Sequence, residues 1–430
     1  MSNSMNSMGR RAVLGLFGAA GAVGVSPLFS QAAFATATDG KAATRIVVDD
    51  NGDKVEVPEK IERIVVTNIL PLASAVAVYL NDGSKIVGMH PASYSAAKNG
   101  LLGELYPEVL KADTGFIQGA NLNIEALMAL KPDVVLVNAP DRRMIDMIRG
   151  AGLTAFGISP SKWHYDVIET HNQWMRSLAE LFPEVQGKGE AIEAKSLEIA
   201  KLVADRTKDL KREERARILF VFRYDAKSLV TSGKNFFGQY WCDAVGGINV
   251  AEGITADNAN AVIGMEEVYG YDPDVIFITN FTAAVPEDIY KNKVGGDDWS
   301  PVKAVREKRV FKMPLGIYRS YTPSADTPLT LLWMAKRVYP ERFKDIDLEA
   351  YVKDYYRTVF GVELTSRQSR AHCCRRCGRK PRCDGEDANE SISPRFPCEK
   401  RSPQLSEESA DFFAKEQQSF CCKIGFLSFD

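Results

Sequence analysis

Histidine is scarce in this sequence, with only four in 430 residues. Imidazole is a common ligand of transition metals, so a site that holds a bare metal ion mainly through histidine would need most of them. The formal charge almost cancels, at −2 from 54 basic and 56 acidic residues. Such a balance supplies no field that would hold nucleic acid or an anionic membrane, and neither is expected as a partner.

Cysteine is almost absent from the body of the chain. Cys242 is alone there, whereas the other seven cysteines all fall within the last 65 residues. The body is therefore expected to fold without a disulfide. Cys242 is expected to be a small buried apolar residue rather than a nucleophile.

Motifs of common enzyme classes are missing as well. The chain contains no Gly-x-x-x-x-Gly-Lys-Ser/Thr, no Gly-x-Ser-x-Gly and no His-Glu-x-x-His, so nothing supports a nucleotide-binding loop, a hydrolase serine or a zinc protease site. His164 and His171, with Asp166 between them, imitate a metal pair, but solvated or packing histidines are the simpler interpretation. The sequence predicts no enzyme and no resident cofactor.

The apolar run near the start is too short to cross a bilayer. It covers residues 12–25, about 14 residues, whereas a membrane-spanning helix needs roughly 20. Two adjacent arginines precede the run, and an Ala-Phe-Ala segment ending at Ala35 follows it, as in an export signal. The arginine pair resembles a twin-arginine signal. We expect residues 1–35 to be removed near Ala35 and the mature protein to reside in the periplasm.

Short apolar runs alternate with helical stretches over residues 36–365. This alternation is typical of parallel sheets covered by helices and predicts an α/β fold. The candidate strands are Ile64–Thr67, Ile86–Met89, Val134–Val137, Ala155–Ile158, Ile218–Phe222, Val275–Thr279 and Val310–Met313.

One stretch breaks this rhythm and predicts a long amphipathic helix. Residues 187–214 contain no proline and place Ile192, Ile199, Val203 and Leu210 on one apolar stripe among many charges. About 25 helical residues reach roughly 37 Å, the width of a small domain. Such a helix could brace two lobes, although an ordinary surface helix of one domain would give the same pattern.

A phrase that repeats 141 positions apart indicates two lobes of similar build. In each copy a glutamate, Glu125 or Glu266, stands seven residues before a Pro-Asp pair that an apolar strand follows. Both copies predict a short helix, a stop enforced by proline and a buried strand. We therefore divide the body into a first lobe of residues 36–186, a connecting helix of residues 187–214 and a second lobe of residues 215–365.

The repeated Glu-x₆-Pro-Asp phrase resembles the solute-binding proteins of ABC importers for iron–siderophore complexes, haem and cobalamin. The Trp299–Phe311 and Tyr339–Phe343 segments are similar to that family too. The resemblance covers residues 45–364. It implies two similar α/β lobes joined by one long rigid helix, with a ligand cleft between them.

The function that this resemblance implies is capture of an iron–siderophore complex and its delivery to a membrane permease. Iron would be present only inside the chelate, and a monomer is expected. A cobalamin or haem carrier of the same fold is the first alternative, and a periplasmic enzyme acting on a metal complex is the second. Catecholate, hydroxamate, carboxylate, haem and corrinoid ligands are all compatible with the sequence.

Family members dock onto their permease through one glutamate on each lobe, paired with permease arginines. The matching positions here are Glu125 and Glu266. Exposed carboxylates near helix starts would set orientation and encounter rate more than affinity. Stabilisation of the helix by its own dipole is the alternative role. Glu267 adjoins Glu266 and competes with it for the assignment.

Ligands of open α/β sheets collect beyond the carboxyl ends of the strands, so residues after each predicted strand are candidate contacts. A flat anionic chelate suits aromatic walls and guanidinium groups, which makes Arg223 and Arg319 the expected anchors. A structural ion pair is the alternative for each arginine. His90 or a tyrosine phenolate could complete an unsaturated iron coordination sphere. The other expected contacts are Asn68, Tyr94, Asn138, Trp163, Tyr224, Phe237, Asn280, Phe281 and Tyr318.

The composition changes abruptly at Ser366, to Arg, Ser, Glu and paired cysteines without helical or strand rhythm. We expect residues 366–430 to be unstructured, or to arise from an altered reading frame or a fused segment, and to play no part in ligand capture. Four of the cysteines, from Cys373 to Cys383, have a spacing that could reach one zinc ion. Seven cysteines outside any disulfide framework are nevertheless unusual for an exported chain.

Overall fold

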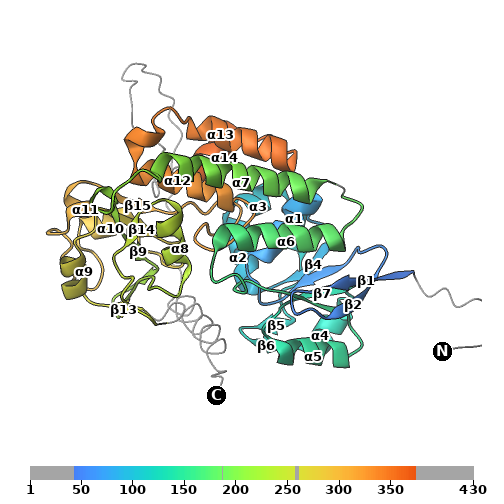
Figure 1. The fold of residues 1–430 in the computed structure, drawn as a ribbon. Coiled ribbons are helices and arrows are strands. Elements are labelled where there is room, and N and C mark those ends of the chain that lie inside the picture. The colour runs from blue at the N-terminus through green and yellow to red at the C-terminus, as the bar shows by residue number, and fades with distance from the viewer. Residues whose placement is uncertain (1–42, 186, 257–260, 374–430) are drawn as a thin grey trace, which may run out of the picture. The chain divides into compact units, whose positions relative to one another are not determined.

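The computed structural model describes residues 43–185, 187–256 and 261–373 (Figure 1). The predicted export signal and almost all of the predicted cysteine-rich tail lie outside these residues. Within the described ranges, no helix is long and apolar enough to cross a membrane.

The first lobe is built on a four-stranded parallel sheet with the strand order β4-β3-β7-β8. In the sequence, a β-hairpin of β1 and β2 precedes this sheet, and a very short hairpin of β5 and β6 lies between β4 and β7. The strands of the lobe are β1 (Thr44–Val48), β2 (Lys54–Pro58), β3 (Ile64–Val66), β4 (Ile86–Met89), β5 (Ile117–Gln118), β6 (Asn121–Leu122), β7 (Val134–Asn138) and β8 (Ala155–Ile158).

The second lobe repeats this topology with the strand order β12-β9-β14-β15, again all parallel. If the four strands of each parallel sheet are numbered in chain order, both sheets have the strand order 2-1-3-4. All seven predicted strands are present, so the predicted α/β fold with two similar lobes is confirmed. The strands are β9 (Arg217–Val221), β12 (Ile248–Asn249), β14 (Val275–Ile278) and β15 (Val310–Lys312), with a small antiparallel sheet of β10 (Arg223–Tyr224), β11 (Leu229–Val230) and β13 (Val262–Ile263).

Helices connect the parallel strands, as crossover connections require. The α-helices are α1 (Leu72–Leu80), α2 (Pro91–Asn99), α3 (Leu101–Leu105), α4 (Ile124–Ala129), α5 (Arg142–Gly150), α6 (Val167–Leu181), α7 (Lys188–Thr207), α8 (Phe237–Ala244), α9 (Met265–Tyr271), α10 (Pro286–Tyr290), α11 (Lys303–Arg306), α12 (Thr327–Val338), α13 (Leu348–Tyr355) and α14 (Ser366–Cys373).

Two equivalent hydrogen-bonded clusters explain why the Pro-Asp phrase repeats. In the first lobe the Asp133 carboxylate accepts the Arg63 backbone N–H at 2.8 Å, and in the second the Asp274 carboxylate accepts the Arg217 N–H at 2.8 Å. Each arginine guanidinium also donates to a carbonyl group at the end of the short helix, α4 or α9. The phrase therefore joins a helix end to the starts of two neighbouring strands.

The connecting helix α7 buries Ile192, Ile199 and Val203, as its apolar stripe predicts. It ends at Thr207, so the prediction that it extends to Glu214 was wrong. The chain turns after Thr207, where the Leu210 N–H donates to the Thr207 carbonyl at 3.1 Å. Leu210 remains buried after this turn, which is why the stripe continues in the sequence beyond the end of the helix.

One continuous hydrophobic core passes through both lobes by way of α7. One face of the first sheet contributes Val66 and Leu136, α7 contributes Ile199, and one face of the second sheet contributes Phe220 and Phe277. The opposite face of each sheet packs into a smaller core of its own lobe. Because the shared core is close-packed, small displacements of the lobes are favoured over wide hinge closure.

Ordered structure continues beyond the predicted body. Helix α14 begins at Ser366, where the Gln368 side chain accepts the Thr365 N–H at 2.9 Å, and Ser369 is fully buried against α13. The prediction of an unstructured segment from Ser366 was therefore wrong for its first eight residues. The remaining predicted tail, with the cysteines after Cys373, lies outside the described residues.

Candidate functional site

Polar side chains follow the central strands of the first sheet at their carboxyl ends. Asn68 is buried, and its side chain joins two strand ends: Nδ2 donates to Asp141 at 3.1 Å, and Oδ1 accepts the Asn138 backbone N–H at 3.1 Å. The Oδ1 of Asn138 is buried without a hydrogen-bond partner among the described residues. Asn68 is thus a structural tie, whereas Asn138 has unused capacity to bind a ligand.

His90 ends β4 and caps α2. Its Nδ1 accepts the Ala92 N–H at 3.1 Å, and its Nε2 lies 3.3 Å from the Gly119 carbonyl, so both ring nitrogens are engaged. Burial, with a smaller effect of Arg319, lowers the pKa of His90 to about 4. The imidazole is therefore neutral at physiological pH, and coordination of iron would break one of its two hydrogen bonds.

The two lobes meet close to Arg319, where the Leu101 N–H donates to the Gly316 carbonyl at 3.0 Å. Arg319 is 7% exposed. Its guanidinium carbon lies 4.9 Å from the centre of the Phe281 ring and 5.7 Å from that of Tyr318. Burial raises the pKa of Tyr318, and its hydroxyl, close to the guanidinium, makes no hydrogen bond of normal geometry with a described residue. Arg319 is a cation held between aromatic rings at the lobe junction.

An aromatic cluster fills the second-lobe side of the junction. Phe281 stacks on Phe222 at 5.1 Å between ring centres, and Phe222 and Phe237 both contact Phe236. The buried hydroxyl of Tyr321, which touches these rings, donates to Ser232 and accepts the Gly238 N–H. The predicted contacts Phe237, Phe281 and Arg319 therefore come together in space.

Tyr165 of the first lobe packs edge-on against this cluster, at 5.9 Å from Phe236 and 5.1 Å from Phe237. It follows β8 in a loop where His164 and Tyr165 both have positive φ angles, 52° and 62°. Two consecutive non-glycine residues in this region are strained, as is common near functional sites. The predicted contact Trp163 is half-buried in the same loop. Sequence reasoning missed Tyr165, although its place just before the helix-capping Asp166 marks a loop end.

Several other predicted contacts have structural roles. The Tyr224 hydroxyl donates to the Val294 carbonyl at 2.9 Å and accepts the Trp299 indole N–H at 3.0 Å inside the core of the second lobe. Asn280 donates to the carbonyl of Pro314 at 2.7 Å and so fixes the start of the loop that carries Arg319. Tyr94 donates to the Leu110 carbonyl. Arg223 lies half-buried on β10 and takes part in none of these hydrogen bonds.

The two histidines that imitate a metal pair do not form one. His164 is exposed, whereas His171 is fully buried with Nδ1 beside the Asn172 side-chain oxygen at 3.0 Å. Burial lowers the pKa of His171, so it packs as a neutral residue. No group of three or more His, Cys, Asp or Glu side chains that could hold a metal ion occurs in the described part of the chain. Cys242 is fully buried, as predicted.

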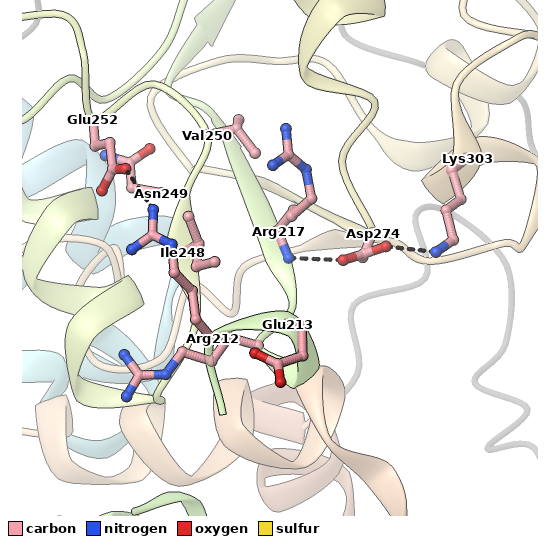
Figure 2. A pocket seen from close by; sticks show the side chains of 10 residues that line it. Arg212, Glu213, Arg217, Ile248, Asn249, Val250, Glu252, Asp274 and Lys303 are labelled. Carbon is pink, nitrogen blue, oxygen red and sulfur yellow. Dashed lines mark hydrogen bonds and ion pairs between the residues drawn. The ribbon is translucent and has the colours of Figure 1, made fainter. Parts of the chain in front are cut away.

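A cavity of about 590 Å³ lies at the opposite edge of the second sheet, where β9, β12 and β14 begin (Figure 2). Most of its charged side chains already have partners: Lys303 pairs with Asp274 at 2.7 Å, Arg212 lies 3.7 Å from Glu252, and the Arg217 guanidinium donates to the Tyr271 carbonyl at 2.8 Å. The carboxyl-end rule places ligands at the other edge, so this cavity is not the candidate ligand site.

The predicted docking glutamates occupy equivalent places in the two lobes. Glu125 and Glu266 are exposed in the first turns of α4 and α9, and neither has an ion-pair partner among the described residues. The neighbouring Glu267 accepts the Gly264 N–H at 2.9 Å and so caps the start of α9. Since that carboxylate stabilises the helix start, Glu266 is the better match to Glu125.

Asp50, in the turn after β1, holds the start of the loop after β8 through a carboxyl group with an unusual pKa. The Asp50 carboxylate accepts the Ser159 N–H at 2.6 Å, and Lys162 donates to the Asp50 carbonyl. Burial, partly opposed by these two residues, raises the pKa of Asp50 to about 6 from 3.8. The folded state therefore binds this proton more tightly than the unfolded chain, and the associated stability is present below pH 3.8 and lost as the pH rises through 6.

We expect the Asp50→Asn variant to be more stable than the wild type at pH 7, by on the order of 3 kcal/mol, and equally stable at pH 3.5. Asparagine can still accept the Ser159 N–H but carries no charge to desolvate. Chemical unfolding followed at several pH values measures the difference. A gap that is independent of pH would contradict the assigned titration.

Comparisons with known proteins agree with this architecture. A family model described as "Periplasmic binding protein" matches residues 75–315. The molybdate-binding protein MolA of Haemophilus influenzae is 29% identical over 338 residues, which cover 74% of this chain and 91% of MolA. The Fe(3+)-citrate-binding protein YfmC of Bacillus subtilis is 24% identical over 217 residues, covering 50% of this chain and 64% of YfmC.

Solved structures of periplasmic binding proteins have the same fold as this chain. A periplasmic solute-binding protein from Veillonella parvula has a TM-score of 0.68 at 28% identity and covers 76% of this chain and 95% of its own. The structure of MolA bound to molybdate has a TM-score of 0.63 at 28% identity, covering 75% of this chain and 99% of its own.

Proposed function

Since this chain belongs to the periplasmic binding protein family and is the substrate-binding protein of an ABC importer, we propose that its ligand is a compact metal-containing oxyanion of the molybdate type. The buried Arg319 at the lobe junction is the observation that carries this proposal. A guanidinium cannot lose its proton in the physiological range and pairs with oxyanions through two parallel hydrogen bonds.

The burial of the surrounding residues supports a small ligand. His90, Asn138, Phe237, Tyr318 and Arg319 each expose less than a tenth of their surface. His90, Asn138, Tyr318 and Arg319 offer a few polar atoms. The rings of Phe222, Phe236 and Phe237 are each less than a tenth exposed, so little ring surface is open to a wide ligand. The buried Tyr318 hydroxyl would donate a further hydrogen bond, and MolA, whose structure has molybdate bound, is 28% identical to this chain.

An iron–siderophore complex or another ferric chelate is the second candidate. The ring cluster around Phe281 and the similarity to an Fe(3+)-citrate-binding protein favour it. Cobalamin and haem, which are larger, would need more of the buried surface to open. With a ferric chelate as the ligand, iron would be present only as part of that chelate, and the protein would hold no resident cofactor.

Titration calorimetry with the mature protein tests the proposal. We expect saturable, equimolar binding of sodium molybdate and tungstate, with quenching of Trp163 fluorescence, and much weaker binding of sulfate. Binding of ferric citrate or a ferric catecholate alone would favour the second candidate. Heat from none of these, or turnover of a metal complex instead of stoichiometric retention, would refute a binding role for the junction.

We further propose that the mature protein is a periplasmic monomer that starts near residue 36 and docks onto its permease through Glu125 and Glu266. Both carboxylates are exposed and are available for permease arginines, where they would orient the complex.

The Glu125→Lys and Glu266→Lys double variant is expected to reduce ligand uptake by cells at least tenfold, because each lobe would present a repulsive charge to the permease. Ligand affinity of the purified variant should match the wild type. Glu363→Lys, at an exposed glutamate outside α4 and α9, is the matched control and should transport normally. Normal uptake by the double variant would discard the docking role.

A further inference from the structure

Exposed apolar side chains are few, and two of them recur at equivalent places in the lobes. Seven large hydrophobic side chains in the described part of the chain are well exposed, among them Met128 on α4, at 47%, and Tyr269 on α9, at 42%. These two positions are 141 residues apart, the spacing of the repeated phrase. Each follows the exposed glutamate of its helix by three residues. In each lobe a carboxylate and an apolar side chain therefore share one helix face.

Neither side chain serves the core of its lobe. Leu127 on α4 and Val268 on α9 are the residues that these helices bury. The Tyr269 hydroxyl donates to the Asp298 carbonyl at 2.7 Å, which holds the ring in place on the surface. Single exposed hydrophobic residues are ordinary, but the same pairing beside an unpaired carboxylate in both lobes needs a common cause.

We propose that Met128 and Tyr269 are apolar anchors for the permease, flanking the two docking glutamates. This inference rests on the proposed docking role of Glu125 and Glu266. The partner that fits is a membrane permease with two-fold symmetry, whose two periplasmic surfaces each present an arginine beside an apolar recess. Two similar patches on one chain match such a repeated surface, because each lobe then meets one copy of it.

The glutamates and the apolar side chains are expected to contribute differently to binding. An exposed ion pair contributes little net affinity, since solvent screens it and two long side chains must be ordered. Burial of a thioether or an aromatic ring displaces water and dominates binding energy at interfaces. The glutamates would thus set orientation, and Met128 and Tyr269 would set the lifetime of the complex.

The combined Met128→Ala and Tyr269→Ala variant tests the inference. Its apparent affinity for the cognate permease in proteoliposomes, measured as half-maximal stimulation of ATP hydrolysis, is expected to fall at least tenfold. Molybdate affinity should stay unchanged, since neither side chain lies at the lobe junction. Thermal stability should fall only slightly, because Tyr269→Ala removes one exposed hydrogen bond. Leu197→Ala on α7, at a residue 50% exposed, is the matched control and should behave as the wild type. Unchanged stimulation by the double variant would overturn the inference.

Photo-crosslinking provides a readout that does not depend on the ligand. Replacement of Met128 or Tyr269 by p-benzoylphenylalanine should yield crosslinks in native membranes to the same periplasmic segment of the permease, identified by mass spectrometry. Crosslinks to a second copy of this chain, or none from either position, would refute the proposed anchors. If the Glu125→Gln and Glu266→Gln double variant weakens docking but the Met128→Ala and Tyr269→Ala double variant does not, the docking role of the glutamates is supported and the apolar anchors are refuted. If neither pair has an effect, both proposals fail.

Discussion

The Arg319→Ala variant is expected to lose at least a hundredfold in ligand affinity while remaining folded. Arg319 is buried between Phe281 and Tyr318 and influences His90 of the other lobe. Removal of a buried charge that pairs with an anionic ligand costs about 2–5 kcal/mol of binding free energy, because the ligand charge is then left without its partner. Calorimetry with molybdate, and with ferric citrate in parallel, measures the loss.

Arg223 supplies the matched comparison for this prediction. Both arginines follow strands of the second lobe, but Arg223 is half-buried on β10. We therefore expect Arg223→Ala to weaken binding by less than tenfold. Arg319→Lys should restore only part of the affinity, because an ammonium cannot donate two parallel hydrogen bonds. Equal losses from both alanine variants would show that charge near the junction, rather than the position of Arg319, determines binding.

The Asp326→Ala variant is expected to be destabilised by about 3 kcal/mol or more and to lose ligand affinity as well. Asp326 is fully buried at the end of the loop that carries Arg319. Its carboxylate accepts the Ile317 N–H at 2.9 Å, the Ser324 hydroxyl at 2.6 Å and the Tyr356 hydroxyl at 3.3 Å. Each buried donor left without an acceptor costs about 1–3 kcal/mol. Guanidinium chloride unfolding and calorimetry measure the two effects.

Ser324→Ala removes one donor of this cluster without leaving another unsatisfied, and is expected to cost less than about 1 kcal/mol. The comparison separates loss of one hydrogen bond from loss of the whole anchor. If Asp326→Ala unfolds at the denaturant concentration of the wild type, Asp326 does not hold the loop. If stability falls but affinity does not, the loop geometry around Arg319 is independent of Asp326.

Seven of the eight strands in the two parallel sheets were predictable because each is an apolar run bounded by turn residues, and a buried parallel strand needs little else. The eighth, β12, has only two residues and was missed. The repeat was predictable for a related reason. Asp133 and Asp274 each hold the start of a neighbouring strand, so the Pro-Asp phrase recurs wherever this local arrangement is built. The ends of helices were less predictable. Helix α7 ends at Thr207, but the turn that follows returns Leu210 to the same core, so the apolar pattern continues past the helix.

The candidate site was predictable only in part. The carboxyl-end rule selected Arg319, His90 and Phe281, whose role as ligand contacts stays a prediction, but it treats all residues after a strand alike. Arg223 and Tyr224 are adjacent on β10, so their side chains point to opposite faces, and Tyr224 enters the core of its lobe. The position of a residue in the sequence does not show whether its side chain lies on the face of the sheet that is turned toward the junction.

The sequence by itself determined the two-lobed α/β architecture, the bridging helix and the exposed glutamates, since periodicity and an internal repeat are local properties of the chain. Only the tertiary structure decided which side chains meet. Tyr165 reaches Phe236 and Phe237 across the junction, and the Leu101 N–H donates to the Gly316 carbonyl across more than two hundred residues. Such contacts depend on the packing of α7 and the shared core, which place distant loops together and leave no trace in local sequence patterns.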